Sequence, residues 1–423
     1  MPVVDCDSHI YEPPEMWDRV PLEYRGVARS AFYHEVAPDG SRLTIVNGAP
    51  GRELNRTRLV RQAIWRPGMT IEQIGELDPD VFQPLTPGAY EVTPRLADMD
   101  AMGIDVGIVF PTLLNEYLPL IENPEAAAVL AAAYNDWLWD FAGEAKGRLH
   151  PVALLPMNSP LLARRELDRV VEKGFTSVVM RPAFYDTPRI IEHSPQAQIE
   201  EMLRRMLTAA SGGSDAGERV FVEDRTYRPL WAHLAEVDVT VCVHPSVGTT
   251  GPDSVSSGAF ADRVSRRLGA VHTVAEPIAY MQDADVFMTA AFFHGLLEDH
   301  PDLRLAIMHS GASWVPLALE KSETYLWLSP QFGRADVCLE PEEVWDHHPI
   351  LVEFDGWERA VGRMPDRLGA KAAWGSRYPA HDTSTPAEAR AMLESQGVDA
   401  ATVDRLLGGY ASDLFRLSTV THA

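Results

Sequence analysis

The sequence predicts an α/β fold, a (β/α)8 TIM barrel with long insertions at the C-terminal ends of its strands. Eight short, apolar segments alternate with helical segments, which is typical of parallel strands covered by helices on their outer side. Eight such units suit a closed barrel better than an open, doubly wound sheet. None of these segments is followed by a glycine-rich nucleotide-binding fingerprint, which weighs against the open alternatives.

The strands and helices of this barrel can be placed in order along the chain. The expected strands are residues 3–9, 105–111, 149–156, 176–181, 239–244, 303–309, 350–354 and 372–376. The expected helices are residues 94–103, 124–147, 160–174, 227–237, 284–300, 313–327, 357–368, 385–396 and 399–407. Proline, serine and glycine mark several of the helix ends, as they commonly do in proteins.

Three irregular stretches interrupt this alternation. We expect one barrel domain, residues 1–423, with insertions at 13–93, 183–224 and 246–282. Within the first insertion, residues 31–36 and 42–46 flank a Pro-Asp-Gly turn and predict a β-hairpin. Loops at the ends of barrel strands commonly carry binding residues, so we expect the insertions to wall a pocket and set substrate choice.

Composition limits the classes of function. The chain has 423 residues, of which 46% are hydrophobic and 23% are charged, a profile typical of globular proteins. Its net charge of −24 disfavours nucleic acid and anionic membranes as partners. No apolar run approaches the ~20 residues of a membrane span. Three scattered cysteines and the lack of a signal-peptide pattern predict a cytoplasmic protein without disulfides.

The first predicted strand ends in three ionisable residues, Asp5, Asp7 and His9. Side chains alternate along a strand, so all three project to the same face. Burying three ionisable side chains is energetically costly unless they form a functional site. The alternative is an edge strand whose polar face lies in water. In a barrel the C-terminal ends of the strands line the active-site mouth, which favours a site.

Other predicted strands also end in candidate functional residues: Arg181, His244 and His309. Each histidine alone could be a hydrogen-bonded structural residue. Together, however, Asp7, His9 and His244 offer one carboxylate and two imidazoles, a ligand set that suits zinc, manganese or iron(II). His309 would then be free to act as a general acid or base near neutral pH. Arg181 is a candidate for substrate contact.

Four motifs resemble those of a known family. They are VDCDSHIYEPP at residues 4–14, VCVHPS at 241–246, MHSGASWVP at 308–316 and WGSRYPAHD at 374–382. Their order and spacing resemble the metal-dependent amidohydrolase superfamily. The closer resemblance is to the branch of aminocarboxymuconate-semialdehyde decarboxylase and related aromatic-acid decarboxylases and hydrolases, and it covers nearly the whole chain.

The resemblance implies roles for individual residues. Asp7, His9 and His244 match the family's ligands for a divalent metal, zinc or manganese. His309 matches the usual catalytic acid or base, and Glu12 is typical of the branch, where we count it as a substrate-binding candidate. The implied substrate is a small aromatic or unsaturated carboxylic acid. Relatives are often dimers, so a homodimer is expected, and the apolar stretch 406–417 could form the interface or pack on the barrel floor.

One position departs from the family pattern. Relatives carry an aspartate after the eighth strand that binds the metal and often shuttles a proton, and this chain has Arg377 there. A guanidinium is always charged, so it would repel a dication placed close to it. The nearby Asp382 or His381 could take the place of the missing ligand. Arg377 is therefore both a catalytic and a substrate-binding candidate.

Three arrangements of this site are open. In the first, the metal stays on its three ligands and Arg377 turns outward to grip a substrate carboxylate or phosphate. In the second, Arg377 replaces the metal and neutralises Asp5, Asp7 or Glu12. In the third, catalysis is lost and a binding or assembly role remains.

Two functions from different classes follow. The first is a metal-dependent enzyme, a non-oxidative decarboxylase or a hydrolase of a small carboxylic acid. The resemblance favours decarboxylation. The alternative is a diverged, metal-free member with altered chemistry or a ligand- or partner-binding role.

Overall fold

Parallel strands form the centre of the protein. The computed structural model describes residues 1–50, 58–184, 220–223, 225–245, 275–328 and 337–417. The central strands are β1 Val4–His9, β5 Val106–Phe110, β6 Leu149–Pro151, β7 Ala153–Leu154, β8 Ser177–Met180, β11 Thr240–Val243, β12 Arg304–Ile307, β13 Ile350–Phe354 and β14 Ala372–Trp374. They pair in two runs, β1-β5-β6 and β14-β13-β12-β11-β8-β7, and every pairing within these runs is parallel.

Two features connect these runs into a ring. β6 and β7 are successive parts of one predicted strand, separated by Val152, and each pairs with a different run. At the other seam, the N–H of Arg377 donates to the carbonyl of Asp7 at 2.8 Å, and the N–H of His9 donates to the carbonyl of Tyr378 at 2.7 Å. These bonds join the chain after β14 to β1. The α/β barrel predicted from the sequence is confirmed.

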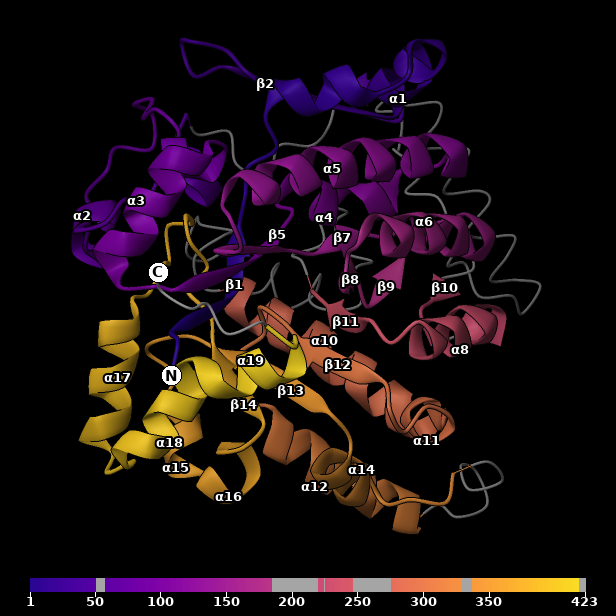
Figure 1. The fold of residues 1–423 in the computed structure, drawn as a ribbon, viewed down its shortest axis with the longest axis vertical. Helices are drawn as coiled ribbons and strands as arrows, with labels where there is room; N and C mark the ends of the chain where they lie inside the picture. Colours follow the sequence, from indigo (N-terminus) through magenta and orange to yellow (C-terminus); the bar gives the residue numbers. More distant parts are fainter. Residues whose placement is uncertain (51–57, 185–219, 224, 246–274, 329–336, 418–423) are drawn as a thin grey trace, which may run out of the picture.

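Helices surround the strands. They are α1 Arg25–Ala31, α2 Ile71–Gly75, α3 Val92–Met102, α4 Leu113–Tyr117, α5 Pro124–Glu144, α6 Pro160–Lys173, α8 Arg228–Glu236, α10 Ala275–Phe293, α11 Leu296–Asp299, α12 Val315–Leu328, α14 Pro341–His347, α15 Ala360–Arg363, α16 Pro365–Leu368, α17 Pro386–Ser395, α18 Ala400–Asp404 and α19 Tyr410–Leu414. α5 contacts α6, and α12 contacts both α10 and α14. Figure 1 shows α5 and α6 on one side of the strands and α12 and α14 on the opposite side.

Two expected helices differ from the prediction. The helix expected at 284–300 begins earlier, at Ala275, inside the stretch that was expected to be an insertion. It ends before Gly295, whose φ of +66° is the left-handed conformation that glycine adopts at low cost, and α11 follows. The helix expected at 357–368 is split into α15 and α16 at Pro365, because proline lacks the N–H that would continue the helical ladder.

The predicted hairpin of the first insertion is confirmed. β2 Phe32–Val36 pairs antiparallel with β3 Arg42–Val46, and a short β4, Ala49–Pro50, extends the sheet. The phenol of Tyr11 and the imidazole of His34 are hydrogen-bonded at 2.8 Å, which ties this hairpin to the chain after β1. The expected insertions at 183–224 and 246–282 lie largely outside the described residues.

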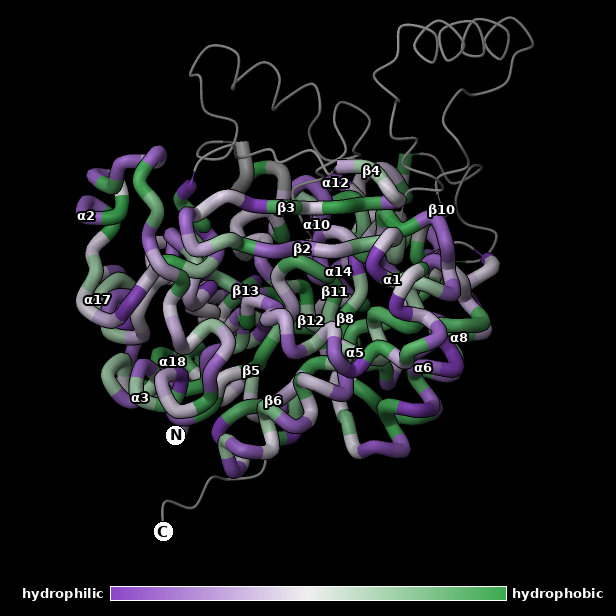
Figure 2. Tube along the Cα trace, turned by 90° about the horizontal axis from the view of Figure 1, so that it is seen from above, coloured by the Kyte–Doolittle hydropathy of each residue, from purple (hydrophilic) through white to green (hydrophobic). Residues whose placement is uncertain are grey.

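The apolar residues of the central strands form the core. Figure 2 shows mostly hydrophobic residues along the central strands, whereas hydrophilic residues lie mainly toward the outside. The C-terminal segment completes this core: Leu406, Leu407 and Phe415 are buried, and α19 contacts β1, β13 and β14. Of the two roles expected for stretch 406–417, packing on the barrel floor is the one observed. Among the described residues, no helix is both long and apolar enough to cross a bilayer.

Candidate metal centre and active site

Four side chains from three strand ends meet at one point. Asp7 and His9 lie on β1, His244 directly follows β11, and His309 lies two residues after β12. One potential ligand atom from each lies within 4.8 Å of the others, and all four residues are buried. The four residues that sequence reasoning assigned to the metal and to proton transfer therefore lie together.

Asp7 is at the centre of this cluster. Its Oδ2 accepts a hydrogen bond from Nδ1 of His309 at 2.8 Å. Its Oδ1 lies 3.2 Å from Nε2 of His9 and 3.6 Å from Nε2 of His244, and it has no hydrogen-bond partner. Burial by itself would raise the pKa of Asp7, but the imidazoles of His309 and His9 outweigh it and hold this pKa well below its ordinary value. The carboxylate is therefore charged.

Backbone carbonyls orient the two other histidines. Nδ1 of His9 lies 3.1 Å from the carbonyl oxygen of Pro111, and Nδ1 of His244 lies 2.7 Å from that of Pro245. A carbonyl can only accept, so each Nδ1 donates to it and is engaged away from Asp7. Asn115 adds a further contact at 3.0 Å from Nδ1 of His244. Both Nε2 atoms therefore face Oδ1 of Asp7.

This arrangement fits a divalent cation. The Nε2 atoms of His9 and His244 lie 3.3 Å apart, and Oδ1 of Asp7 lies within 3.6 Å of both. A carboxylate oxygen and two imidazole nitrogens are the types of donor atom that bind zinc or manganese in proteins. Metal–ligand bonds of about 2.0–2.2 Å separate neighbouring ligands by roughly 3.0–3.4 Å, close to the spacing observed. Mixed nitrogen and oxygen donors of this kind suit zinc or manganese.

His309 is held as a neutral base beside this cluster. Its ring stacks on His244 with centroids 4.8 Å apart, and Tyr280 meets it edge-on at 4.6 Å. Burial lowers the pKa of His309 to about 3, although Asp7 acts in the opposite direction. Because Nδ1 donates to Asp7, the lone pair is on Nε2, which has no hydrogen-bond partner among the described residues.

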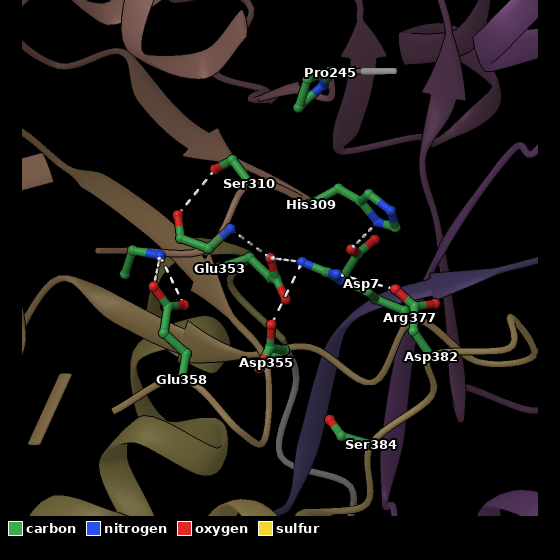
Figure 3. A network of polar contacts seen from close by, with 12 residues as sticks. Asp7, Pro245, His309, Ser310, Glu353, Asp355, Glu358, Arg377, Asp382 and Ser384 are labelled. Carbon is green, nitrogen blue, oxygen red and sulfur yellow. Dashed lines mark hydrogen bonds and ion pairs between the residues drawn. The ribbon is translucent and has the colours of Figure 1, made fainter. Parts of the chain in front are cut away.

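Arg377 turns toward acidic residues outside the cluster. Its Nη1 donates to Oδ2 of Asp382 at 3.1 Å, and its Nη2 lies 3.8 Å from carboxylate oxygens of Glu353 and Asp355 (Figure 3). Burial would raise the pKa of Asp382, but Arg377 outweighs it and lowers that pKa to about 2. Burial keeps the pKa of Glu353 well above its ordinary value, even though Arg377 partly opposes it. Of the three acidic residues, Asp382 is the one closest to Arg377, and its low pKa keeps it charged for an ion pair.

The partners considered for Arg377 in a metal-free site are bonded elsewhere. Asp5 accepts hydrogen bonds from the N–H and the hydroxyl of Ser376 at 2.8 and 2.5 Å. Glu12 accepts from the N–H groups of Leu113 and Leu114, both at 2.9 Å, at the start of α4. Among the described residues, neither Asp382 nor His381 belongs to the potential ligand group that includes Asp7.

Two residues that follow barrel strands have unusual backbones. His309 has a φ of +55° and Arg377 a φ of +60°. Residues other than glycine adopt this left-handed conformation at a cost of about 1 kcal/mol or more, and such strain concentrates at functional sites. The left-handed backbone changes the direction in which each of these two side chains leaves the chain after its strand. Arg181, the third basic candidate, is buried and donates to the carbonyl of Glu116 at 3.4 Å, outside the ligand cluster.

Close packing at Gly375 places Glu353, a residue not predicted from the sequence, next to Asp7. A Cβ on Gly375 would lie 2.6 Å from Cβ of Asp7 and 2.8 Å from Cγ of Glu353, so only glycine fits between them. Glu353 is fully buried within β13. The sequence did carry a signal for it, because a glutamate inside the apolar segment Ile-Leu-Val-Glu-Phe is unusual. Asn115 and Arg95, which contact the same site, carried no comparable signal.

In barrel enzymes the active site lies at the C-terminal ends of the strands, and the carboxylate and imidazole side chains of this α/β barrel gather at the same place. The profile of the amidohydrolase family matches residues 4–417. The chain therefore belongs to the amidohydrolase family.

Individual relatives agree with this assignment. The γ-resorcylate decarboxylase of Rhodococcus jostii strain RHA1 is 25% identical over 236 residues, 53% of this chain and 60% of that relative. Among solved structures, an amidohydrolase from Mycobacterium avium subsp. paratuberculosis K-10 matches with a TM-score of 0.72 and 18% identity over 99% of both chains. The dihydroxybenzoic acid decarboxylase of Polaromonas sp. JS666, solved with manganese and 2-nitroresorcinol, matches with a TM-score of 0.61 and 14% identity over 98% of this chain and 97% of its own. At these identities, the two structures show the fold.

Proposed function

We propose that the protein is a metal-dependent, non-oxidative decarboxylase of a small aromatic or unsaturated carboxylic acid. The observation that carries the proposal is the close approach of three potential ligand atoms: Oδ1 of Asp7 lies 3.2 and 3.6 Å from the Nε2 atoms of His9 and His244, which are 3.3 Å apart. The decarboxylases among its relatives support the choice of reaction, and the manganese in one of them supports manganese over zinc.

The metal would be held by Asp7, His9 and His244. When bound, it would supply positive charge that binds the substrate carboxylate and a neighbouring oxygen. Arg377 would not contribute to this site, because its guanidinium is engaged by Asp382 and flanked by two further acids. We therefore assign to Arg377 the role of holding the chain after β14. The proposed site is the arrangement in which the metal stays on its three ligands, but Arg377 does not bind the substrate.

His309 would move the proton. Its Nδ1–H is fixed on Asp7, so Nε2 is the atom that takes up and releases a proton. Because burial keeps the imidazole neutral, His309 starts as a base. Nε2 would take up one proton from solvent and deliver it to the carbon that loses CO2. The electrons of the broken C–C bond would form the new C–H bond, so that the substrate carboxylate and one proton give the product and CO2. Arg181 remains our candidate for contact with the substrate.

Metal analysis tests this proposal directly. Protein purified without chelator should contain about one manganese or zinc per chain, and Asp7→Asn and His244→Gln should lose it. His233→Gln is the matched control, because His233 is paired with Asp168 at 2.6 Å and lies outside the cluster. CO2 release from a panel of hydroxybenzoates should require the metal. Protein that contains no metal and binds neither added Mn²⁺ nor Zn²⁺ would overturn the proposal in favour of the metal-free alternative.

A further inference from the structure

We propose that Arg95 is a positioning residue for the metal centre, an inference that rests on the proposed function. Arg95 lies on α3 and is completely buried. Its Nη1 donates to the carbonyl oxygens of His9 at 2.8 Å and Gly88 at 3.2 Å, and its Nη2 donates to the hydroxyl of Ser8 at 2.5 Å. One guanidinium thus holds the last two residues of β1 from outside the ligand cluster.

The same guanidinium also contacts the other side of the barrel seam. Its centre lies 4.5 Å above the ring centroid of Tyr378, the residue after Arg377, and the Tyr378 hydroxyl donates to Asp98 on α3. The carbonyl of Tyr378 accepts the N–H of His9 at 2.7 Å. Arg95 therefore fixes both chains at the point where β1 meets the segment after β14.

These contacts determine where the His9 imidazole points. The N–H of His9 is bonded to Tyr378, its carbonyl to Arg95 and its Nδ1 to Pro111. With the backbone held on both sides, Nε2 has one direction, which is toward Asp7 and His244. Loss of the Arg95 contact would free the carbonyl of His9 and loosen one ligand of the proposed metal.

The free-energy cost of burying the guanidinium of Arg95 indicates that this side chain has a specific role. A buried guanidinium is expensive unless opposite charge and hydrogen bonds compensate it. The acceptors of Arg95 are neutral oxygens, and the attraction of Asp5 and Asp98 acts as longer-range compensation. The planar fork of arginine reaches two carbonyls and a hydroxyl at once, a task that lysine, with one nitrogen, performs less well.

The test compares the buried Arg95 with a partly buried arginine, Arg148, at another place in the fold, where Arg148 also pairs with Asp100 at 2.9 Å. Arg95→Met removes the proposed positioning contacts while keeping similar volume. Arg148→Met is the matched control, because Arg148 also donates to backbone carbonyls, those of Ile104 and Asp105, both at 2.7 Å, but away from the metal cluster. Affinity for Mn²⁺ alone is measured on metal-stripped protein by electron paramagnetic resonance, and folding is checked by circular dichroism.

We expect Arg95→Met to weaken Mn²⁺ binding by roughly 10- to 100-fold, as loss of contacts that orient metal ligands typically does. Arg95→Lys should recover part of this loss, and Arg148→Met should bind within twofold of wild type. Wild-type affinity in folded Arg95→Met would overturn the inference. If Arg95→Met does not fold, wild-type affinity in both Arg95→Lys and Ser8→Ala would overturn it instead. Failure of the wild-type protein to bind Mn²⁺ or Zn²⁺ would instead overturn the proposed function.

Discussion

Arg377 stands where the family resemblance implies an aspartate, so replacing it tests whether it serves structure. We predict that Arg377→Met destabilises the protein while leaving Asp7, His9 and His244 able to bind metal. Methionine keeps much of the buried volume and removes only the charge and the hydrogen bond to Asp382 at 3.1 Å. The loss of stability should therefore come from the lost ion pairs and not from a cavity.

The structure sets the size of the effect. Arg377 lowers the pKa of Asp382 from its ordinary 3.8 to about 2, which corresponds to roughly 2 kcal/mol. Because this pKa is depressed, the stabilisation is present above about pH 4 and is lost as the pH falls toward 2. Glu353 should add less, because burial raises its pKa and so disfavours its charged form. Breaking a buried pair costs up to about 3–5 kcal/mol, so we expect a loss of about 2–4 kcal/mol at pH 7.

Urea unfolding at pH 7, followed by tryptophan fluorescence and circular dichroism, measures this loss. Arg390→Met is the control, since Arg390 pairs with Asp404 at 2.7 Å and is 37% exposed, so its removal should cost less than about 1 kcal/mol. Equal losses in the two variants would refute the reasoning. Arg377→Asp should be worse still, because it replaces the cation with another carboxylate beside Asp355 and Asp382.

Three further predictions concern other residues. His309→Gln should lower turnover by at least about 100-fold and keep the bound metal, measured by steady-state kinetics with metal analysis; full turnover would remove His309 from proton transfer. Burial lowers the pKa of His150 to about 4, so the protein should lose stability as the pH falls from 6.5 toward 4 and this imidazole must be protonated while buried. His150→Gln should reduce this acid-induced loss of unfolding free energy by about 3 kcal/mol in urea unfolding. An unchanged dependence of stability on pH would contradict this prediction. Gly375→Ala should destabilise by about 1–3 kcal/mol through its clash with Asp7, whereas Gly143→Ala, in open space within α5, should stabilise slightly; thermal unfolding that ranks the two in the opposite order would count against the packing argument.

The sequence by itself determined the barrel and the candidate ligands. Apolar strands that alternate with helices are a local property of the chain, so their order was readable without coordinates. Barrel geometry then places every strand's C-terminal end at one mouth, which is why Asp7, His9, His244 and His309 could be grouped. The breaks at Gly295 and Pro365 were misjudged because helix boundaries depend on packing as well as on local pattern.

The tertiary structure alone decided what surrounds those ligands. Whether Arg377 pairs with Asp7 or with Asp382 depends on where its side chain turns at a strained residue, and periodicity carries no such information. Likewise, Arg95 reaches His9 across 86 positions of sequence, and His309 reaches Asp7 across 302. Contacts of this range arise only when folding brings distant strand ends together, because hydrogen bonds and ion pairs depend on distances of a few ångströms.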